Sequence, residues 1–448
     1  MKQLLQLLRL GQHQERFGQY GPEWIAWKSI STMHSYRIPA TDNSKWLLLR
    51  YLPGCIRWVL SAKPLVVEAP GSKEAVLHIA PKGEDRNHEY LCSVRQPKAL
   101  MCLYKSNLGP ISNAHRFRLL WQLLPLLWFL LRATWRFPDR YRNLAFALRE
   151  CLETACLLQL LQHHHIERVY MFGGFEKDAN LFALACQSTG IYIHKIPSSN
   201  SLIYFYTYLI ADELALTTAY HQEEANRLLG MKWNVGKLSE WPPMNAHRLH
   251  VQLPTYRKPP PQSLGFYSRG AWFRKVAGDS SRNAGELASE FELIRQLRAY
   301  HVKHPQVNLT VFLHPIERSN LEAYQKAEGY YRTVIGSSVQ VYPFGKDTLE
   351  GFDAVDVAIS SYSSSNIERL YCGFKTLFAP LHMKNPLFNT RVMQPITILD
   401  AEQVEPVINK TLALSRQAFF AQENLSTFLA ASVQLTPDSL SSEEQKIA

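Results

Sequence analysis

The chain has 448 residues, more than one ordinary hydrophobic core accommodates, so we expect two domains. Hydrophobic residues make up 46% and charged residues 19% of the sequence, which excludes an intrinsically disordered chain. The net charge of +11 favours an anionic partner, but no run of adjacent Lys and Arg forms a basic tail, so we expect no nucleic-acid partner.

The seven cysteines form no Cys-x-x-Cys pair, and their odd number predicts reduced thiols in a cytoplasmic protein. Residues 1–10 (MKQLLQLLRL) are basic and apolar, but Gln and Arg interrupt them and no small-residue cleavage site follows. We therefore expect an amphipathic first helix rather than a secretory signal.

The first half of the chain changes character near residue 113. Before it, we predict a loop at residues 82–87 (KGEDRN) and strands at 46–51, 65–68, 75–79 and 99–104. From residue 113 to 162 the pattern is mainly helical. Strands then alternate with helices, which predicts a parallel sheet; the strands are 166–172, 191–196 and 213–217, and the helices 178–190 and 218–229.

The segment Leu119–Leu131 (LLWQLLPLLWFLL) is the most apolar stretch in the chain. It is shorter than the roughly 20 residues of a membrane-spanning helix. It fits either a buried core helix or a helix on an anionic membrane surface, with aromatic rings at headgroup depth. Tryptophans at spacing seven and flanking arginines support the second reading; they are Trp121, Trp128, Trp135, Arg116, Arg118, Arg132 and Arg136.

Residues 253–262 (LPTYRKPPPQ) contain four prolines and predict a stiff linker between domains at 1–252 and 263–436. We expect residues 437–448 to form a flexible tail. The second domain shows repeated strand–helix alternation, typical of a doubly wound sheet. We predict strands at 263–267, 307–313, 339–342, 356–359, 375–379 and 396–399, and helices at 285–301, 319–334, 347–352, 365–371 and 401–413.

A histidine and a proline end one predicted strand of the second domain. Pro315 cannot continue a strand and fixes a turn, so we expect the imidazole of His314 to point away from the sheet edge. There a ring N–H can donate to a phosphate. Taken alone, the pair also fits an ordinary strand-end histidine.

A group of serines ends another predicted strand of this domain. Ser361, Ser363 and Ser364 precede a helix, and Ser365-x-x-Glu368 has the spacing of a capping box. The N-terminus of a helix attracts anions, and small hydroxyls add donors. Glu368 would complete the box or reach a ribose.

We expect both motifs to face one phosphate, because each lies at the carboxyl end of a strand in the same parallel sheet. Between them we place the strand that ends in Tyr342–Lys346 (YPFGK), so that Phe344, Gly345 and Lys346 lie beside the nucleotide and Phe344 reads its base. A third turn follows the first strand of the domain and would lie near the same ligand; it consists of Ser268, Arg269 and Gly270.

The His-Pro strand end followed by a Ser-Ser/Thr strand end resembles the bacterial sialyltransferases and their relatives, the capsule Kdo transferases and the teichoic-acid glycerol-phosphate transferases. The resemblance covers mainly residues 263–400. It implies a GT-B fold, an α/β architecture in which two Rossmann-like domains with parallel sheets face a central cleft. It also implies that His314, Ser363 and Ser364 hold the phosphate of a cytidine nucleotide donor, with Ser361 less closely matched.

The implied activity is inverting, metal-independent glycosyl transfer without a cofactor, from a nucleotide-sugar such as a CMP-sugar to a bacterial surface glycan or lipid-linked acceptor. The first domain would bind the acceptor, and the second the donor, at the inner face of an anionic cytoplasmic membrane. Three alternatives stay open: a CDP-polyol phosphotransferase of the teichoic-acid type, an epimerase of the UDP-sugar type, and a non-catalytic GT-B-like binding or assembly protein.

Inverting transfer needs a general base for the acceptor hydroxyl. The sialyltransferases have an acidic pair followed by Gly at a strand end of the first domain, whereas this chain has Gly173–Asp178 (GGFEKD), with a different order. Glu176 and Asp178 are the candidate bases, although Asp178 also fits a helix cap. Glu84 and Asp85 form a second candidate pair.

We predict no bound metal. The run His163–His165 places consecutive side chains in different directions, so the three do not form one ligand set. Neither the Asp-x-Asp of metal-dependent transferases nor a P-loop is present.

Overall fold

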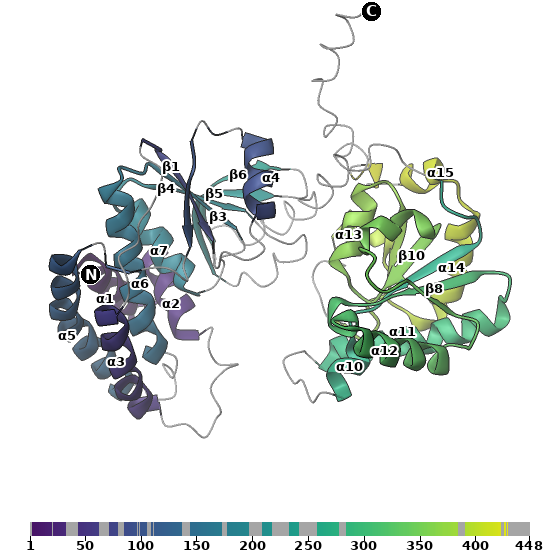
Figure 1. Ribbon diagram of the computed structural model, residues 1–448, viewed down its shortest axis with the longest axis horizontal. Helices are drawn as coiled ribbons and strands as arrows, with labels where there is room; N and C mark the ends of the chain where they lie inside the picture. Colours follow the sequence, from purple (N-terminus) through teal and green to yellow (C-terminus); the bar gives the residue numbers. More distant parts are fainter. Residues whose placement is uncertain are drawn as a thin grey trace, which may run out of the picture. The chain divides into compact units, whose positions relative to one another are not determined.

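A computed structural model describes residues 2–19, 21–32, 44–61, 71–78, 85–95, 97, 99–104, 109–110, 112–136, 144–172, 177–196, 208–216, 233–241, 258–276, 284–383, 390–422, 425–426 and 428. These residues divide into two compact units (Figure 1). Unit 1 contains the described residues up to Trp241, and unit 2 those from Lys258 onward. The predicted tail and half of the predicted linker lie outside the described residues.

Unit 1 is built on a six-stranded, all-parallel sheet in the order β2-β1-β3-β4-β5-β6. Its central strands are almost entirely buried, as expected for a parallel sheet that is covered on both faces. The strands are β1 (Glu74–His78), β2 (Met101–Tyr104), β3 (Arg168–Phe172), β4 (Tyr192–Ile196), β5 (Leu209–Leu216) and β6 (Trp233–Glu240).

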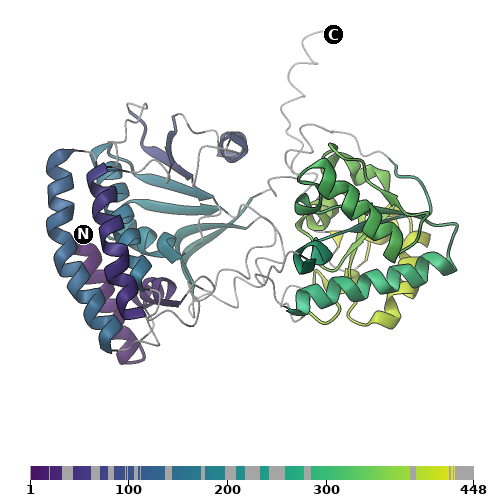
Figure 2. The same cartoon turned by 60° about the horizontal axis from the view of Figure 1, so that its bottom comes forward.

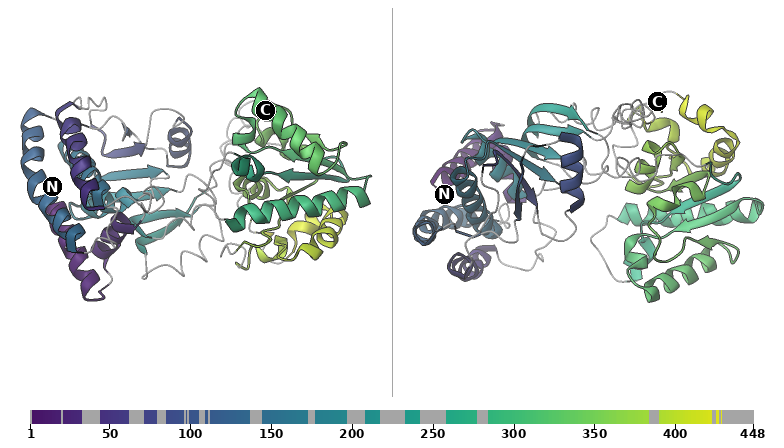
Figure 3. Two further views of the ribbon diagram at one scale, coloured as in Figure 1. Left: turned by 90° about the horizontal axis from the view of Figure 1, so that it is seen from below. Right: turned by 45° about the horizontal axis from the view of Figure 1, so that its top comes forward.

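Most helices of unit 1 form two layers on one side of this sheet, whereas α4 lies on the other side, with its Tyr90 ring 6.3 Å from that of Phe172 (Figure 1). Helices α2 and α7 contact the sheet, and α6 lies over α7. Helices α3 and α5 pack against α6 and against each other in an outer layer (Figures 2 and 3). The described helices are α1 (Lys2–Arg16), α2 (Pro22–Thr32), α3 (Ser44–Ser61), α4 (Asp85–Arg95), α5 (Asn113–Arg136), α6 (Leu144–His163) and α7 (Lys177–Gln187).

The strand predicted at residues 46–51 is wrong, because this segment lies in α3. Half-buried Leu52 and buried Cys55 and Val59 follow helical spacing, so packing against α6 favours a helix. The predicted 82–87 loop is also wrong in part, since α4 begins at Asp85. The predicted strand at 65–68 and helix at 218–229 lie outside the described residues.

Unit 2 contains a five-stranded parallel sheet in the order β11-β10-β7-β8-β9. Helices α11 and α12 lie on one face of the sheet and α13 on the other (Figure 1). The strands are β7 (Ser263–Tyr267), β8 (Asn308–Phe312), β9 (Gln340–Val341), β10 (Val357–Ser360) and β11 (Lys375–Phe378). The helices are α10 (Ala271–Val276), α11 (Ala284–Lys303), α12 (Leu321–Val334), α13 (Ser364–Tyr371), α14 (Val404–Ala413) and α15 (Arg416–Phe420).

The predicted strand at 396–399 is wrong except for one position. Residues 394–396 form a short 3-10 helix, and Thr397 makes a single bridge to Phe378 of β11. The two parallel α/β sheets that the GT-B prediction requires are both present. That they face a common cleft stays a prediction.

Candidate functional site

The strand order of unit 2 reverses at β7. From β7 the chain proceeds through β8 to β9 on one side, and then through β10 to β11 on the other. In open parallel sheets, ligands bind at the carboxyl ends of the strands where the order reverses. The turns after β7, β10 and β8 therefore lie side by side at the position that favours a ligand.

This order corrects one prediction. The strand between β8 and β10 is β7, not β9, which pairs only with β8 at the edge of the sheet. The turn with Phe344, Gly345 and Lys346 lies on the outer side of the His314 turn. There the Phe344 ring lies 5.6 Å from the ring of Tyr324 in α12.

The β7 turn, Ser268–Gly270, takes the central place instead. Gly270 has a φ of 73°, and a Cβ atom there would lie 2.8 Å from Cγ2 of Ile316, so the turn needs glycine to approach the His314 turn. Arg269 extends toward the β10 turn and stacks over the Tyr362 ring, with 4.9 Å from its Cζ to the ring centroid. One side chain thus connects the two turns at the reversal.

The hydrogen-bond donors of Arg269 are only partly used in the described structure. Its Nη2 donates to Glu286 Oε2 over 2.9 Å. Its Nη1 is buried and has no hydrogen-bond partner among the described residues. A buried guanidinium N–H without an acceptor is a strong donor to an incoming phosphate oxygen.

The β8 turn fixes the orientation of His314. Its Nδ1 accepts the backbone N–H of Ile316 over 3.2 Å, at the start of a 3-10 helix, Pro315–Arg318. Since Nδ1 accepts this hydrogen bond, the neutral ring carries its own proton on Nε2. The turn therefore sets the tautomer that donates from the outer nitrogen.

The β10 turn leads into the N-terminus of α13. Ser363 is the N-cap residue, but its side chain makes no capping hydrogen bond. The predicted capping box Ser365-x-x-Glu368 is wrong, because α13 begins at Ser364 and its third residue is Asn366. Glu368 lies further along the helix and is buried.

The Ser361 hydroxyl is also buried and has no hydrogen-bond partner among the described residues. Ser364 and Ser365, the first two residues of α13, are partly exposed. The first N–H groups of a helix have no acceptor within it. The β10 turn thus offers hydroxyl and amide donors to an anion.

Two buried glutamates, which the sequence did not single out, hold the β7 and β8 turns. Glu290 of α11 accepts the N–H groups of Arg269 and Ala271 over 2.8 and 3.0 Å. Glu317 accepts the N–H of His314 over 2.9 Å, as well as the indole N–H of Trp272. Only the spacing of Glu317, three residues after His314, resembles a capping pattern that could have indicated its role.

A chain of hydroxyls links the two acids. Glu317 Oε1 contacts the Tyr331 hydroxyl at 2.9 Å, which contacts Ser268 Oγ at 2.6 Å. Ser268 Oγ contacts Glu290 Oε1 at 3.3 Å. If both acids were ionised, each hydroxyl would donate to its neighbouring carboxylate, and the 2.6 Å contact would have no proton. One proton shared by the acids supplies a donor for every contact.

The pKa shifts of the two acids agree with one shared proton. Burial, and secondly the charge of Glu290, raises the pKa of Glu317 to about 7. Burial also raises the pKa of Glu290, although the two N–H donors oppose the shift. The turns that carry Arg269 and His314 are therefore hydrogen-bonded to an acid pair that retains a proton near neutral pH.

Unit 1 has its own order reversal between β1 and β3. The candidate bases follow these two strands in sequence, but Glu84 and Glu176 lie outside the described residues. Asp85 begins α4 and Asp178 lies in the first turn of α7, and nothing is described of either side chain. Their role as general base stays a prediction.

A buried lysine near the end of β4 is the clearest titratable group in unit 1. The Lys195 ammonium donates to Asn180 Oδ1 over 3.0 Å, and burial lowers its pKa to about 7. The next residue along the strand toward the N-terminus, His194, is buried on the opposite face, beside Glu213 at 3.7 Å. Within the described residues, no three His, Cys, Asp or Glu side chains form a group that could hold a metal ion.

The chain matches no protein-family model and no curated protein. Among solved structures it is similar to a mutant O-GlcNAc transferase from Thermobaculum terrenum, with 12% identity, 99% of this chain and 80% of that chain covered, and a TM-score of 0.43. It is also similar to MurG from Acinetobacter baumannii, with 12% identity, coverage of 84% and 99%, and a TM-score of 0.42.

A third similar structure is a UDP-GlcNAc 2-epimerase from Neisseria meningitidis bound to UDP-GlcNAc. Its identity is 8%, the coverage is 81% of this chain and 99% of that chain, and the TM-score is 0.41. Likenesses at this level assign neither an activity nor a substrate to the chain.

Proposed function

We propose that this protein is a glycosyltransferase that binds a nucleotide-sugar donor at the three adjacent turns of unit 2. The observation that carries the proposal is the convergence of Arg269, His314 and the N-terminus of α13 at the reversal of strand order. A guanidinium, an imidazole N–H and helix amides are all donors to phosphate oxygens.

The donor in this proposal is a CMP-sugar, in keeping with the His-Pro and serine motifs. Arg269 offsets the phosphate charge and the His314 ring donates a hydrogen bond to it, so the proposed reaction needs no metal ion. Glu176 or Asp178 accepts the proton of the acceptor hydroxyl as its oxygen bonds to the anomeric carbon, and CMP leaves from the opposite face with inversion of configuration. The acceptor is a bacterial surface glycan, reached from the cytoplasmic side of the membrane.

The test begins with binding. We expect calorimetry to show tighter binding of CMP than of UDP or GDP. His314→Ala should weaken CMP binding at least about tenfold, because a charge-assisted donor is lost. The matched control is His301→Ala, since His301 lies in the last turn of α11, which leads to the amino end of β8. Equal affinity of the wild type and His314→Ala would overturn the phosphate role.

Turnover then distinguishes the remaining alternatives. We expect transfer from a CMP-sugar with no loss of rate in the presence of EDTA. Turnover of a CDP-polyol alone would identify a phosphotransferase. Interconversion of UDP-sugars would identify an epimerase, and nucleotide binding without turnover of any donor would favour a binding or assembly protein.

A further inference from the structure

The outer helices of unit 1 expose an unusual amount of apolar surface. Among the described residues, sixteen large hydrophobic side chains are exposed, and nine of them lie on α3 and α5. By contrast, unit 2 exposes five that are scattered singly over its elements. Contiguous exposed apolar surface of this kind marks an interaction site.

The exposed side chains of α5 form one stripe. Trp121, Trp128 and Trp135 are 77%, 68% and 70% exposed, and Phe117 and Leu124 are also exposed. At about 100° per residue, all five fall within roughly 60° of the helix circumference. The buried side chains occupy the opposite side; they are Leu119, Leu123, Leu126, Phe129, Leu130 and Ala133. The helix is therefore apolar on both faces, toward the core and away from it.

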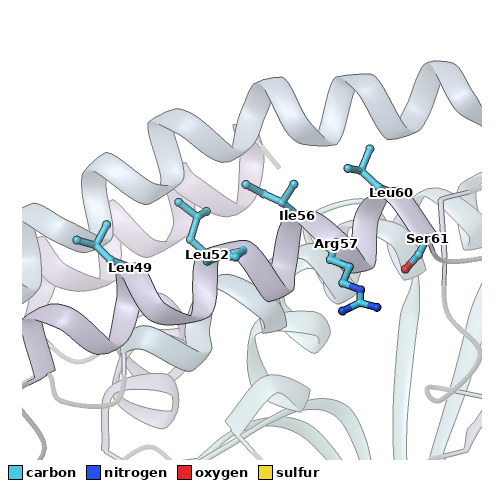
Figure 4. A pocket seen from close by; sticks show the side chains of 7 residues that line it. Leu49, Leu52, Ile56, Arg57, Leu60 and Ser61 are labelled. Atoms are coloured by element: carbon cyan, nitrogen blue, oxygen red, sulfur yellow. The ribbon is translucent and has the colours of Figure 1, made fainter.

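Helix α3 extends this surface. Leu49, Ile56 and Leu60 are exposed along one side of the helix and line a shallow groove of about 540 Å³ (Figure 4). The Arg116 guanidinium donates to the Leu60 carbonyl, so the start of α5 lies beside the end of α3. The two helices run antiparallel and present their apolar side chains from one layer.

The charged residues beside the exposed apolar side chains of α3 and α5 are all positive. The two helices together contain seven Lys and Arg residues and no Asp or Glu, in a chain with a net charge of +11. Arg57 borders the groove of α3, and Arg118 and Arg132 are exposed on α5. A second copy of the same surface would bring arginines against arginines without a carboxylate to compensate them, which disfavours a symmetric dimer.

We infer that α3 and α5 form a membrane-binding face that lies in the interfacial region of an anionic lipid bilayer. Tryptophan rings prefer the headgroup level, and flanking arginines meet lipid phosphates. No helix in the described part of the chain is long and apolar enough to cross a membrane, so the helices lie along the surface. The Trp stripe of α5 inserts, while its opposite face stays packed on the core of unit 1.

The inference does not depend on the donor site, and its test needs no activity. Wild-type protein should float with vesicles of phosphatidylcholine containing phosphatidylglycerol, and the bound fraction should fall with added salt. We expect Trp121→Gln/Trp128→Gln to lower the partition coefficient at least about tenfold, since two interfacial rings are lost. The fluorescence of these tryptophans should also be quenched by brominated lipids.

A matched control replaces two exposed apolar residues of unit 2, Val302→Gln/Leu321→Gln, and should float like the wild type. Both variants should keep the wild-type circular dichroism and melting temperature. Equal flotation of the tryptophan variant and the wild type would overturn the inference. So would a wild-type dimer in solution, without lipid, that the tryptophan variant converts to a monomer, because a second copy would then occupy the face.

Discussion

Burial shifts the pKa of one base in unit 1 and of two acids in unit 2 in opposite directions. Unit 1 buries a base, Lys195, whose pKa falls to about 7 because burial disfavours the charged amine. Unit 2 buries the acids Glu290 and Glu317, and burial raises the pKa of both. Burial favours the neutral form of all three groups, through proton loss from Lys195 and proton retention by the two acids.

The surroundings of these groups differ as well. The unit 2 acids accept backbone N–H groups from the turns that carry Arg269 and His314, so they position candidate ligand-binding groups. Lys195 instead donates to Asn180, which also accepts the N–H of Ile210 over 2.9 Å. The difference indicates that the acids organise a site, whereas Lys195 contacts the interior of its own unit.

The largest expected effect on stability is the pH dependence that the buried acids of unit 2 impose. The folded-state pKa of Glu317, about 7, lies above its ordinary value of 4.5. The folded state therefore binds the proton more tightly, and the contribution of this group to stability is fully present below about pH 4.5 and is lost as pH rises through 7. The loss is on the order of 3 kcal/mol.

Urea unfolding between pH 5 and 8 measures this loss. We expect Glu317→Gln to flatten the dependence, because the titrating group is gone. The control is Glu292→Gln on α11, whose carboxylate pairs with exposed Arg295 and is not part of the network. A wild-type stability that rises across this range would contradict the shared proton.

Replacing Lys195, the buried base of unit 1, should change the free energy of unfolding by a smaller amount and should raise it. Lys195→Met removes an amine whose burial is costly, and Asn180 Oδ1 keeps its bond to Ile210. We expect stability at pH 7 to rise by about 2 kcal/mol, since apolar replacements of buried charges are often stabilising. The gain should shrink toward pH 10.5, where unfolded lysine also loses its proton.

Thermal and urea unfolding of the variant beside the wild type measure this gain. A destabilised Lys195→Met would show that the ammonium is held by interactions that outweigh its burial. A more stable variant with a lower rate of sugar transfer would show that unit 1 retains Lys195 for function at the expense of stability.

The sequence predicted the strands of unit 2 better than their order in space. Apolar runs that end in Pro, Gly and Ser located β7, β8 and β10 to within a residue or two, because burial and turn chemistry are local signals. Neighbours in a sheet are set by crossovers between distant segments, which a single sequence does not encode locally. The sequence placed Arg269 near the same ligand, but not between the two motifs, where the strand order puts it.

The missed features share a similar cause. Glu290 lies within an ordinary amphipathic helix, and only its contact with the β7 turn distinguishes it. For Leu119–Leu131, burial and exposure were posed as alternatives, yet α5 has both, because opposite faces of one helix meet different surroundings. Whether the exposed face meets lipid stays a proposal.

The smallest expected change in stability comes from replacing the N-cap serines, and it distinguishes a capping role from a ligand-binding role. Ser363 and Ser415 are both N-cap residues, but only the Ser415 side chain accepts a backbone N–H, from Ala418 at 3.1 Å. We expect Ser415→Ala to lower the free energy of unfolding by about 1 kcal/mol, and Ser363→Ala by less than about 0.5 kcal/mol.

Nucleotide binding should show the reverse order. Ser363→Ala removes a hydroxyl at the reversal of strand order, so we expect weaker CMP binding at nearly unchanged stability. Ser415→Ala lies at α15, on a different helix, and should leave binding unchanged. If Ser363→Ala instead destabilises the protein as much as Ser415→Ala and binds CMP normally, the serine acts as a cap, and the phosphate role passes to Arg269 and His314 alone.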